Sequence, residues 1–311
     1  MTLPGMAAPN HPASGFAGPN AGVYRLSSGR ELMVTEFGPA EGLPVLYLHG
    51  TPSTGNEWSV LGDDDLLEAC GLRLIAPTRP GLGGSSYLPQ RTLASWKVDV
   101  ADLVAQRGLA RFAVLGYSGG AAYALASALA FEQQISSLTL VAPVLHGDEA
   151  MTAGLDKTGL GLKQLVRNSP SVGRLVLALA MGLPARRFPG LLKQQLLAAL
   201  PHVDAATLQA NGRIEKFVAV LADAFRAGAR GPAQDMALMA SPWDIALRRL
   251  SCPVHIFQGE GDTFGARPAM AEYLAQQLGA NVVRIYPEGH ISIMTNHLRE
   301  ILRTLAASRP T

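Results

Sequence analysis

Six short apolar runs, separated by helical patterns, constrain the fold of this 311-residue chain more than any other feature. The runs are largely continuous and bounded by Gly, Pro or polar residues, as expected for strands buried on both faces of a parallel sheet. Their alternation with helical spacing predicts an α/β fold with a doubly wound, mostly parallel central sheet. The predicted strands are residues 45–48, 72–76, 112–115, 138–142, 254–257 and 282–286, and the predicted helices are residues 58–69, 93–107, 121–131, 267–278 and 291–307.

The alternation stops after Val144 and resumes at Pro253. The residues between are rich in Leu, Ala and Met at helical spacing and contain no strand candidate, which predicts a helical cap inserted at residues 146–245, over the sheet edge where ligands bind. The core domain is then residues 22–145 and 246–311, with an edge hairpin at residues 23–26 and 31–36, and residues 1–21 form a flexible tail. We expect these cap residues to supply an apolar roof or the buried face of the cap helices: Leu175, Val176, Leu177, Leu179, Ala180, Met181, Leu191, Leu192, Leu196 and Leu197.

The amino-acid composition limits the kinds of partner that the protein is expected to bind. Hydrophobic residues make up 48% and charged residues 16% of the chain, with a net charge of +2, which indicates a globular protein without a nucleic-acid-binding face. The longest apolar stretch, residues 175–183, is too short to span a bilayer, and the N-terminus carries no secretion signal. Two cysteines suit a reducing compartment. We expect a cytoplasmic protein with a small-molecule substrate, no nucleic-acid or membrane partner, no cofactor and no metal; a homodimer stays open.

One motif carries the chemistry. Gly116-Tyr117-Ser118-Gly119-Gly120 joins the predicted strand at 112–115 to an alanine-rich helix. This arrangement predicts a sharp turn with Ser118 at its tip, close to a helix N-terminus that favours developing negative charge. Ser118 is therefore the candidate nucleophile.

A serine hydroxyl needs a histidine to take its proton and a carboxylate to orient the imidazole. His290 directly follows the last predicted strand and is the candidate base. Asp262 follows the preceding strand after two glycines and is the candidate acid, with Glu260 as its near competitor and Asp148 as its distant one.

Two backbone N–H groups are needed to stabilise an oxyanion. Gly119 follows the nucleophile, and Thr51 follows the early strand in His49-Gly50-Thr51-Pro52. We expect these two residues to donate. His49 in this motif is expected to organise the loop through backbone hydrogen bonds.

Together the motifs resemble the α/β-hydrolase superfamily, from residue 23 to residue 307. In that family the nucleophile, acid and histidine follow one another in the order found here. Thr78 departs from the Asp that many relatives carry at a structural position, and Thr51 stands where many esterases and perhydrolases carry an aromatic residue. The resemblance rests on His49-Gly50-Thr51-Pro52, Arg79-Pro80-Gly81-Leu82-Gly83-Gly84-Ser85, the Ser118 motif with Gly116 and Gly120, and Gly259…Asp262 with Gly289-His290.

The resemblance implies a serine hydrolase that cleaves an ester-type bond (a carboxylic ester, a thioester or a lactone) of an uncharged, fairly hydrophobic small molecule. Carboxylic ester hydrolysis is the simplest case. Ser118 argues against haloalkane dehalogenases and epoxide hydrolases, which use an aspartate nucleophile, and Ile291 stands where hydroxynitrile lyases carry Lys. Gly119 and Thr51 fit the cofactor-free perhydrolases poorly.

Three alternatives remain open at this stage. A small-molecule receptor and a biosynthetic cyclase or C–C bond enzyme use the same scaffold. An aminopeptidase would need cap carboxylates to bind the substrate amine, and Glu215, Asp223 and Asp235 show no cluster in the sequence.

Overall fold

The fold is an eight-stranded sheet in the order β1-β2-β4-β3-β5-β6-β7-β8, seen in a computed structural model that describes residues 20–146, 149–280 and 282–308. The β1–β2 hairpin is antiparallel and pairs antiparallel with β4, whereas the remaining pairs are parallel. The α/β fold class is therefore confirmed. The strands are β1 Asn20–Arg25, β2 Glu31–Phe37, β3 Leu43–Leu48, β4 Leu72–Pro77, β5 Phe112–Tyr117, β6 Ile135–Val141, β7 Val254–Gly259 and β8 Val282–Tyr286.

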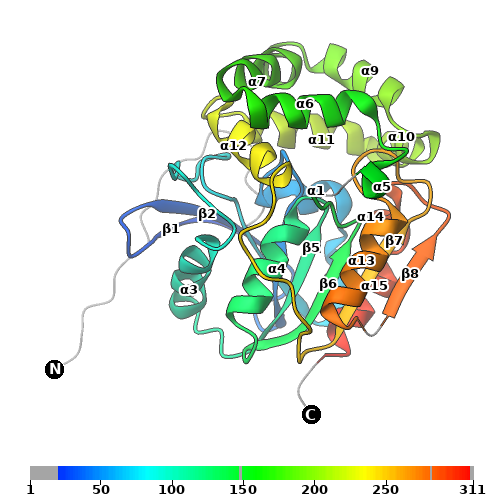
Figure 1. Cartoon of the computed structure of the whole chain (residues 1–311). Helices are drawn as coiled ribbons and strands as arrows, with labels where there is room; N and C mark the ends of the chain where they lie inside the picture. Colours follow the sequence, from blue (N-terminus) through cyan, green and yellow to red (C-terminus); the bar gives the residue numbers. More distant parts are fainter. Residues whose placement is uncertain (1–19, 147–148, 281, 309–311) are drawn as a thin grey trace.

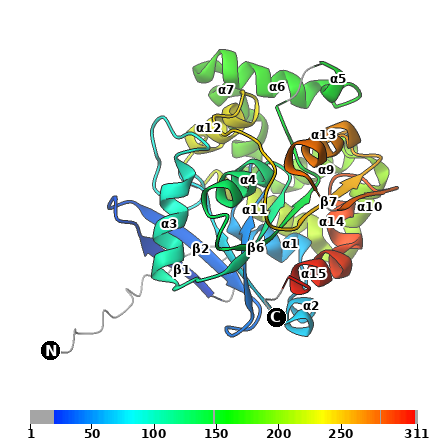
Figure 2. The same cartoon turned by 60° about the horizontal axis from the view of Figure 1, so that its bottom comes forward.

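Helices cover both faces of the sheet (Figures 1 and 2). Helix α2 packs against α15 on one face, and α3 packs against α4 on the other. The central strands β5 and β6 are buried along their whole length, as their continuous apolar runs predict. The core helices are α1 Trp58–Leu61, α2 Asp64–Cys70, α3 Trp96–Gln106, α4 Gly120–Ala130, α13 Pro268–Leu278, α14 Ser292–Asn296 and α15 Leu298–Ala306.

Two predicted helices are each divided in two. The helix predicted for residues 58–69 breaks at Gly62, whose extended backbone lies against the Trp58 indole, and Asp63 then caps a new helix. The helix predicted for residues 291–307 breaks at His297. The prediction of a flexible tail at residues 1–21 is wrong for its last two residues, because Asn20 and Ala21 belong to β1 and pair with β2. Residues 1–19 lie outside the described part of the chain.

Between β6 and β7 the described residues form helices and no strand, and these helices lie over the carboxyl ends of the strands (Figure 1). We refer to residues 149–239 as the cap. Among residues 20–146, 149–280 and 282–308, no helix combines the length and apolar character that crossing a bilayer requires. The cap helices are α5 Glu149–Thr152, α6 Lys157–Asn168, α7 Pro170–Leu177, η2 Ala178–Gly182, α8 Leu183–Arg187, α9 Pro189–Ala199, α10 His202–Gln209, η3 Ala210–Gly212, α11 Arg213–Ala224 and α12 Arg230–Met239.

The prediction that ten apolar residues between 175 and 197 form a roof or the buried face of the cap helices is correct for five of them. Leu177 and Leu192 are buried, and Met181, Leu196 and Leu197 are partly buried and pack against the core. Leu175, Leu179 and Leu191 are instead more than half exposed on the outside of the cap. Helical periodicity places residues on a common face, but it does not say whether that face points inward or outward.

A buried ion-pair cluster fastens the cap to the core. Asp235 of α12 is fully buried and accepts hydrogen bonds from Arg79 (2.6 Å) and Arg91 (2.8 Å). It also accepts from the hydroxyls of Tyr123 (2.8 Å) and Thr51 (2.7 Å). Although burial opposes ionisation, the two guanidinium groups hold the pKa of Asp235 well below its usual value. One cap carboxylate therefore joins three core segments.

The same cluster shapes the loop after β3. Arg79 donates to the carbonyl oxygens of His49 and Gly50 as well as to Thr51 Oγ1. The His49 ring bridges this loop to the next, with Nδ1 near the Gly50 carbonyl (2.9 Å) and Nε2 accepting from the Arg79 backbone (3.3 Å). Burial and the Arg79 charge hold the pKa of His49 well below the usual value, so this ring stays neutral.

Replacing Asp235 with Asn should lower the free energy of unfolding by about 3–5 kcal/mol, because Arg79 and Arg91 would remain buried without a compensating charge. Urea denaturation followed by circular dichroism measures the loss. Glu215→Gln is the matched control: it removes one charge from the solvent-exposed pair with Lys193 and should change stability little. Equal stability of the two variants would show that this cluster does not hold the cap.

Candidate active site

Ser118 occupies a strained turn between β5 and α4. Its φ of +54° lies in the left-handed region, which non-glycine residues rarely adopt. Its backbone N–H donates to the Val141 carbonyl (2.9 Å), which ties the turn to the end of β6. This conformation lifts the hydroxyl off the end of the strand, as the motif predicts.

The glycines on either side of Ser118 allow this turn. A Cβ on Gly116 would lie 2.6 Å from the Ala124 Cβ of α4, and a Cβ on Gly120 would lie 2.0 Å from the Leu48 carbonyl oxygen. Both distances are too short for any side chain. The spacing of the motif is therefore a packing requirement: α4 must pass close to β5 and β3 for the turn to form.

The structure brings Ser118, His290 and Asp262 together from three different loops. The Ser118 Oγ lies 2.8 Å from His290 Nε2, and Asp262 Oδ2 lies 2.6 Å from His290 Nδ1. The other oxygen, Asp262 Oδ1, accepts from the backbone N–H groups of Phe264 (3.0 Å) and Gly265 (3.1 Å). All three members are buried, and the hydrogen bonds form one continuous chain from the hydroxyl to the carboxylate.

The near competitor Glu260 makes no contact with the histidine in the described part of the chain. Glu260 is exposed, and its backbone rather than its side chain is engaged, in a hydrogen bond to Tyr286. Asp148, the distant competitor, lies outside the described residues. Asp262 is thus the carboxylate that the described structure places against His290.

The charges around His290 stabilise its protonated form. Burial alone would lower the pKa of His290, but the charge and hydrogen bond of Asp262 outweigh it and raise the pKa above the usual value. The Asp204 carboxylate adds to this rise, and the Lys163 ammonium opposes it. His290 is therefore stabilised as the imidazolium that forms when a hydroxyl proton is transferred.

Asp204 of α10 fixes the backbone of the loop that carries His290. This role was not predicted from the sequence. It is fully buried and accepts from the backbone N–H groups of His290 (2.8 Å), Ile291 (2.9 Å) and Ser292 (2.9 Å). A Cβ on Gly289 would lie 2.4 Å from both of its oxygens. An acid in the first turn of a cap helix gives no sequence signal of this role, since its partners lie more than eighty residues away.

Thr51 and Gly119 meet beside Ser118, as predicted for an oxyanion site. A Cβ on Gly119 would lie 3.5 Å from the Thr51 backbone nitrogen. Within the described part of the chain, no backbone or side-chain acceptor takes the N–H of either residue. The neighbouring Gly50 N–H is already used, because it donates to Glu57 Oε2 (2.8 Å). Two N–H groups are therefore open next to the serine.

Two further side chains near the site, Glu57 and Lys163, were not predicted from the sequence. Glu57 accepts from the Tyr47 hydroxyl (2.6 Å) and from Gly50, which fixes the loop that carries Thr51. Lys163 of α6 is close enough to the site for its charge to lower the pKa of His290, and the Asp262 charge in turn acts on the pKa of Lys163. Burial lowers the pKa of Lys163, although the Asp262 charge counteracts this effect. Neither residue lies in a recognisable motif.

A metal site would require a cluster of suitable donors. Among residues 20–146, 149–280 and 282–308, no three His, Cys, Asp or Glu side chains come together as such a cluster.

The chain is similar to several known proteins. Over 127 residues the chain is 30% identical to a non-heme chloroperoxidase from Streptomyces lividans, a match that covers 40% of this chain and 45% of that protein. The fold is similar to a thermophilic esterase from Thermogutta terrifontis, with a TM-score of 0.64, 23% identity, and coverage of 92% of this chain and 99% of the esterase. It is also similar to an enol-lactonase from Burkholderia xenovorans, with a TM-score of 0.66, 17% identity, and coverage of 92% and 98%.

The family model of the alpha/beta hydrolases matches residues 45–304, which include Ser118, Asp262 and His290. This match covers most of the chain and includes most of β3, the strands from β4 to β8, the cap and the loops that meet at the site. The chain belongs to the alpha/beta hydrolase family.

Proposed function

We propose that the protein is a serine hydrolase that cleaves an ester-type bond through an acyl-enzyme. The observation that supports this most directly is the hydrogen-bonded chain from Ser118 Oγ through His290 to Asp262, at 2.8 Å and 2.6 Å. The open N–H groups of Thr51 and Gly119 beside the serine add the donors that acyl transfer requires.

In the proposed mechanism, Ser118 Oγ attacks the substrate carbonyl while His290 Nε2 takes the hydroxyl proton. The carbonyl oxygen becomes an oxyanion, and the Thr51 and Gly119 N–H groups stabilise it. His290 then gives the proton to the leaving alcohol or thiol, and the acyl group stays on Ser118. Water activated by His290 attacks the acyl-enzyme, which releases the acid and restores the serine.

The substrate class proposed is an uncharged, fairly hydrophobic carboxylic ester, thioester or lactone. Apolar groups surround the base: the rings of Tyr117 and Phe264 lie 5.4 and 5.5 Å from the His290 ring, and Val144 borders Gly265 beside it. The names of the esterase and enol-lactonase neighbours are compatible with this class. A carboxylic ester is the simplest member.

The structure gives little support to an aminopeptidase. Three cap carboxylates were candidates for binding a substrate amine. Asp235 forms ion pairs with two arginines, and Glu215 pairs with Lys193 at the surface. Asp223 lies beside Arg226 (3.5 Å). They therefore form no acidic cluster at the triad. The relationship to a chloroperoxidase carries less weight than the triad geometry, because it spans under half of either chain.

Ser118→Ala should abolish labelling by a fluorophosphonate probe and reduce ester turnover by at least about a thousandfold, because the covalent step is lost. Labelling measured by mass spectrometry and hydrolysis of a panel of acyl esters provide the readouts. The matched control is Ser127→Ala, a buried serine further along α4 that bonds Trp96 rather than His290. A variant at Ser118 that is still labelled would refute the nucleophile. Ligand-induced stabilisation without turnover of any ester would favour a receptor.

The rate of hydrolysis should rise with pH through the pKa of His290, because only neutral His290 can accept the Ser118 proton. Since Asp262 raises that pKa, the midpoint of kcat/KM should lie above the ordinary histidine value of about 6.5. Lys163→Met removes a nearby positive charge that lowers the pKa, so it should move the midpoint to higher pH.

The matched control for this experiment is Lys193→Met, which removes a cap lysine that pairs with Glu215 and has no interaction with His290. Its midpoint should equal that of the unmodified protein. A midpoint that stays fixed or falls in Lys163→Met would contradict the placement of this ammonium group near the base.

A further inference from the structure

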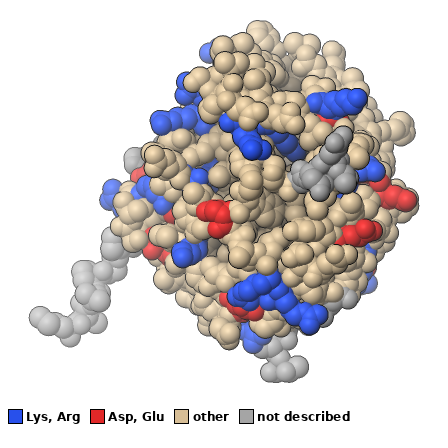
Figure 3. Space-filling model, viewed as in Figure 1, with Lys and Arg blue, Asp and Glu red and all other residues tan. Residues whose placement is uncertain are grey.

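A long segment of the cap, residues 157–203, is basic and contains no acid. From Lys157 to Val203 the chain carries seven Lys and Arg residues and neither Asp nor Glu, although the whole chain has a net charge of only +2. In Figure 3 Lys and Arg groups lie over the upper part of the molecule as well as over its lower part, whereas most of the visible acidic groups lie at mid-height or below. The basic residues are Lys157, Lys163, Arg167, Arg174, Arg186, Arg187 and Lys193.

This basic segment also presents apolar side chains to solvent. Of the eleven large hydrophobic side chains that are exposed in the described structure, seven lie between residues 172 and 191, and they are 37% to 59% exposed. Five of them repeat at helical spacing along the continuous helix α7–η2–α8, so they form one stripe on its outer face. The other two, Phe188 and Leu191, follow at the end of α8 and in α9. We call all seven residues together the outer stripe: Val172, Leu175, Val176, Leu179, Leu183, Phe188 and Leu191.

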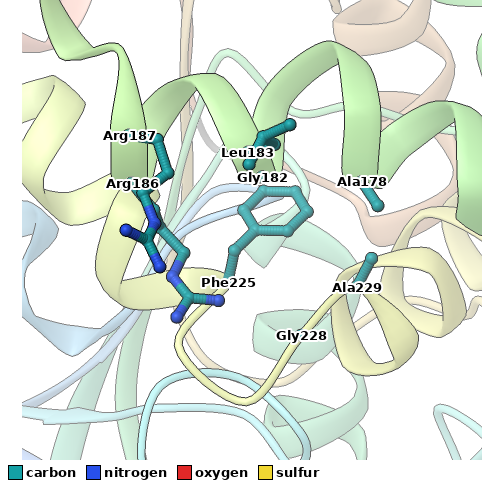
Figure 4. Close-up of a pocket in the computed structure, with 8 residues that line it drawn as sticks. All are labelled: Ala178, Gly182, Leu183, Arg186, Arg187, Phe225, Gly228 and Ala229. Carbon is teal, nitrogen blue, oxygen red and sulfur yellow. The ribbon is translucent and has the colours of Figure 1, made fainter.

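A pocket of about 250 Å³ opens beside the outer stripe, between α8 and the connection from α11 to α12. Its floor is the Phe225 ring, and the Arg186 and Arg187 side chains extend together along one side of it (Figure 4). Both arginines are exposed, and neither forms an ion pair within the described residues. The pocket therefore offers two unneutralised guanidinium groups above an apolar floor.

The positive charge beside the outer stripe favours one class of partner over the others. A second copy of the chain, packed face to face, would bring the Arg186 and Arg187 side chains of both copies together, which like-charge repulsion disfavours. Nucleic acid would neutralise the arginines but leave the outer stripe without an apolar partner. A lipid surface with anionic headgroups satisfies both features, since apolar side chains enter the acyl boundary while Lys and Arg contact the headgroups.

We propose that the cap docks onto an anionic lipid surface through the outer stripe, with Arg186 and Arg187 holding a lipid phosphate at the pocket. The docked helix lies in the plane of the interface and needs no spanning segment. From the sequence we expected no membrane partner because the longest apolar stretch is too short to span a bilayer. Docking at the surface requires no such stretch. The proposal is independent of hydrolysis, although a docked cap would place the triad near apolar molecules dissolved in the lipid.

Co-sedimentation of the full-length protein with vesicles tests the proposal. The protein should bind phosphatidylcholine vesicles that contain phosphatidylglycerol far more strongly than pure phosphatidylcholine vesicles, and high salt should weaken the binding. The double variant Arg186→Gln/Arg187→Gln should bind about 25-fold more weakly, since each basic residue near such a surface strengthens binding about fivefold. Leu175→Ser/Leu179→Ser should bind at least about tenfold more weakly, because it removes apolar groups from the interface.

Matched control variants change exposed residues of the core instead. Lys97→Gln/Arg111→Gln removes two positive charges, and Val23→Ser/Val98→Ser removes two exposed apolar side chains. Both should bind as the unmodified protein does. Circular dichroism and hydrolysis of a water-soluble ester, unchanged in the cap variants, show that the fold and the triad are intact. If no ester is hydrolysed, circular dichroism and the vesicle result still stand.

Three outcomes would overturn the proposal. The first is equal binding, or no binding, to neutral and anionic vesicles. The second is cap variants that bind as well as the core controls. The third is a dimer in analytical ultracentrifugation that Leu175→Ser/Leu179→Ser dissociates, which would show that a second copy covers the outer stripe.

Discussion

The buried charge of Asp235 is the interaction on which the site depends. An ionised carboxylate without water must be compensated, and here two guanidinium groups and two hydroxyls surround it. Arg79 in turn bonds the carbonyl oxygens of the loop that carries Thr51. The position of one proposed oxyanion donor is therefore set by a residue of the cap, 184 positions later in the chain.

A second cap carboxylate performs the same task on the other side of the site. Asp204 binds three successive N–H groups of the histidine loop, so it orients His290 through the backbone while Asp262 orients the ring. The cap thus supports the loops that carry Thr51 and His290 as well as covering them. These buried polar contacts complement the apolar contacts of the cap, in which Leu208, Ile214 and Leu221 belong to the hydrophobic core.

Much of this arrangement could be predicted from local patterns. The strands of the parallel sheet are buried on both faces, so their apolar runs are continuous and easily recognised. The turn at Ser118 needs glycine at both ends for close packing, so its motif is also visible. Predictions failed where a contact distant in sequence decides the outcome. Gly62 ends α1 against the Trp58 ring, and Leu175 faces solvent although its spacing suits a packed helix.

The sequence by itself determined the α/β class, the order of the candidate triad and the position of the inserted helices. These follow from the periodicity of apolar residues, from the residues that turns require and from the order of the motifs, all of which are visible in the sequence. Only the tertiary structure decided that Asp204 and Asp235 hold the two loops, that Lys163 lies near His290, and which face of α7 is exposed. Such choices depend on contacts between residues far apart in the chain and on the direction in which a helix face points, and neither is encoded in spacing alone.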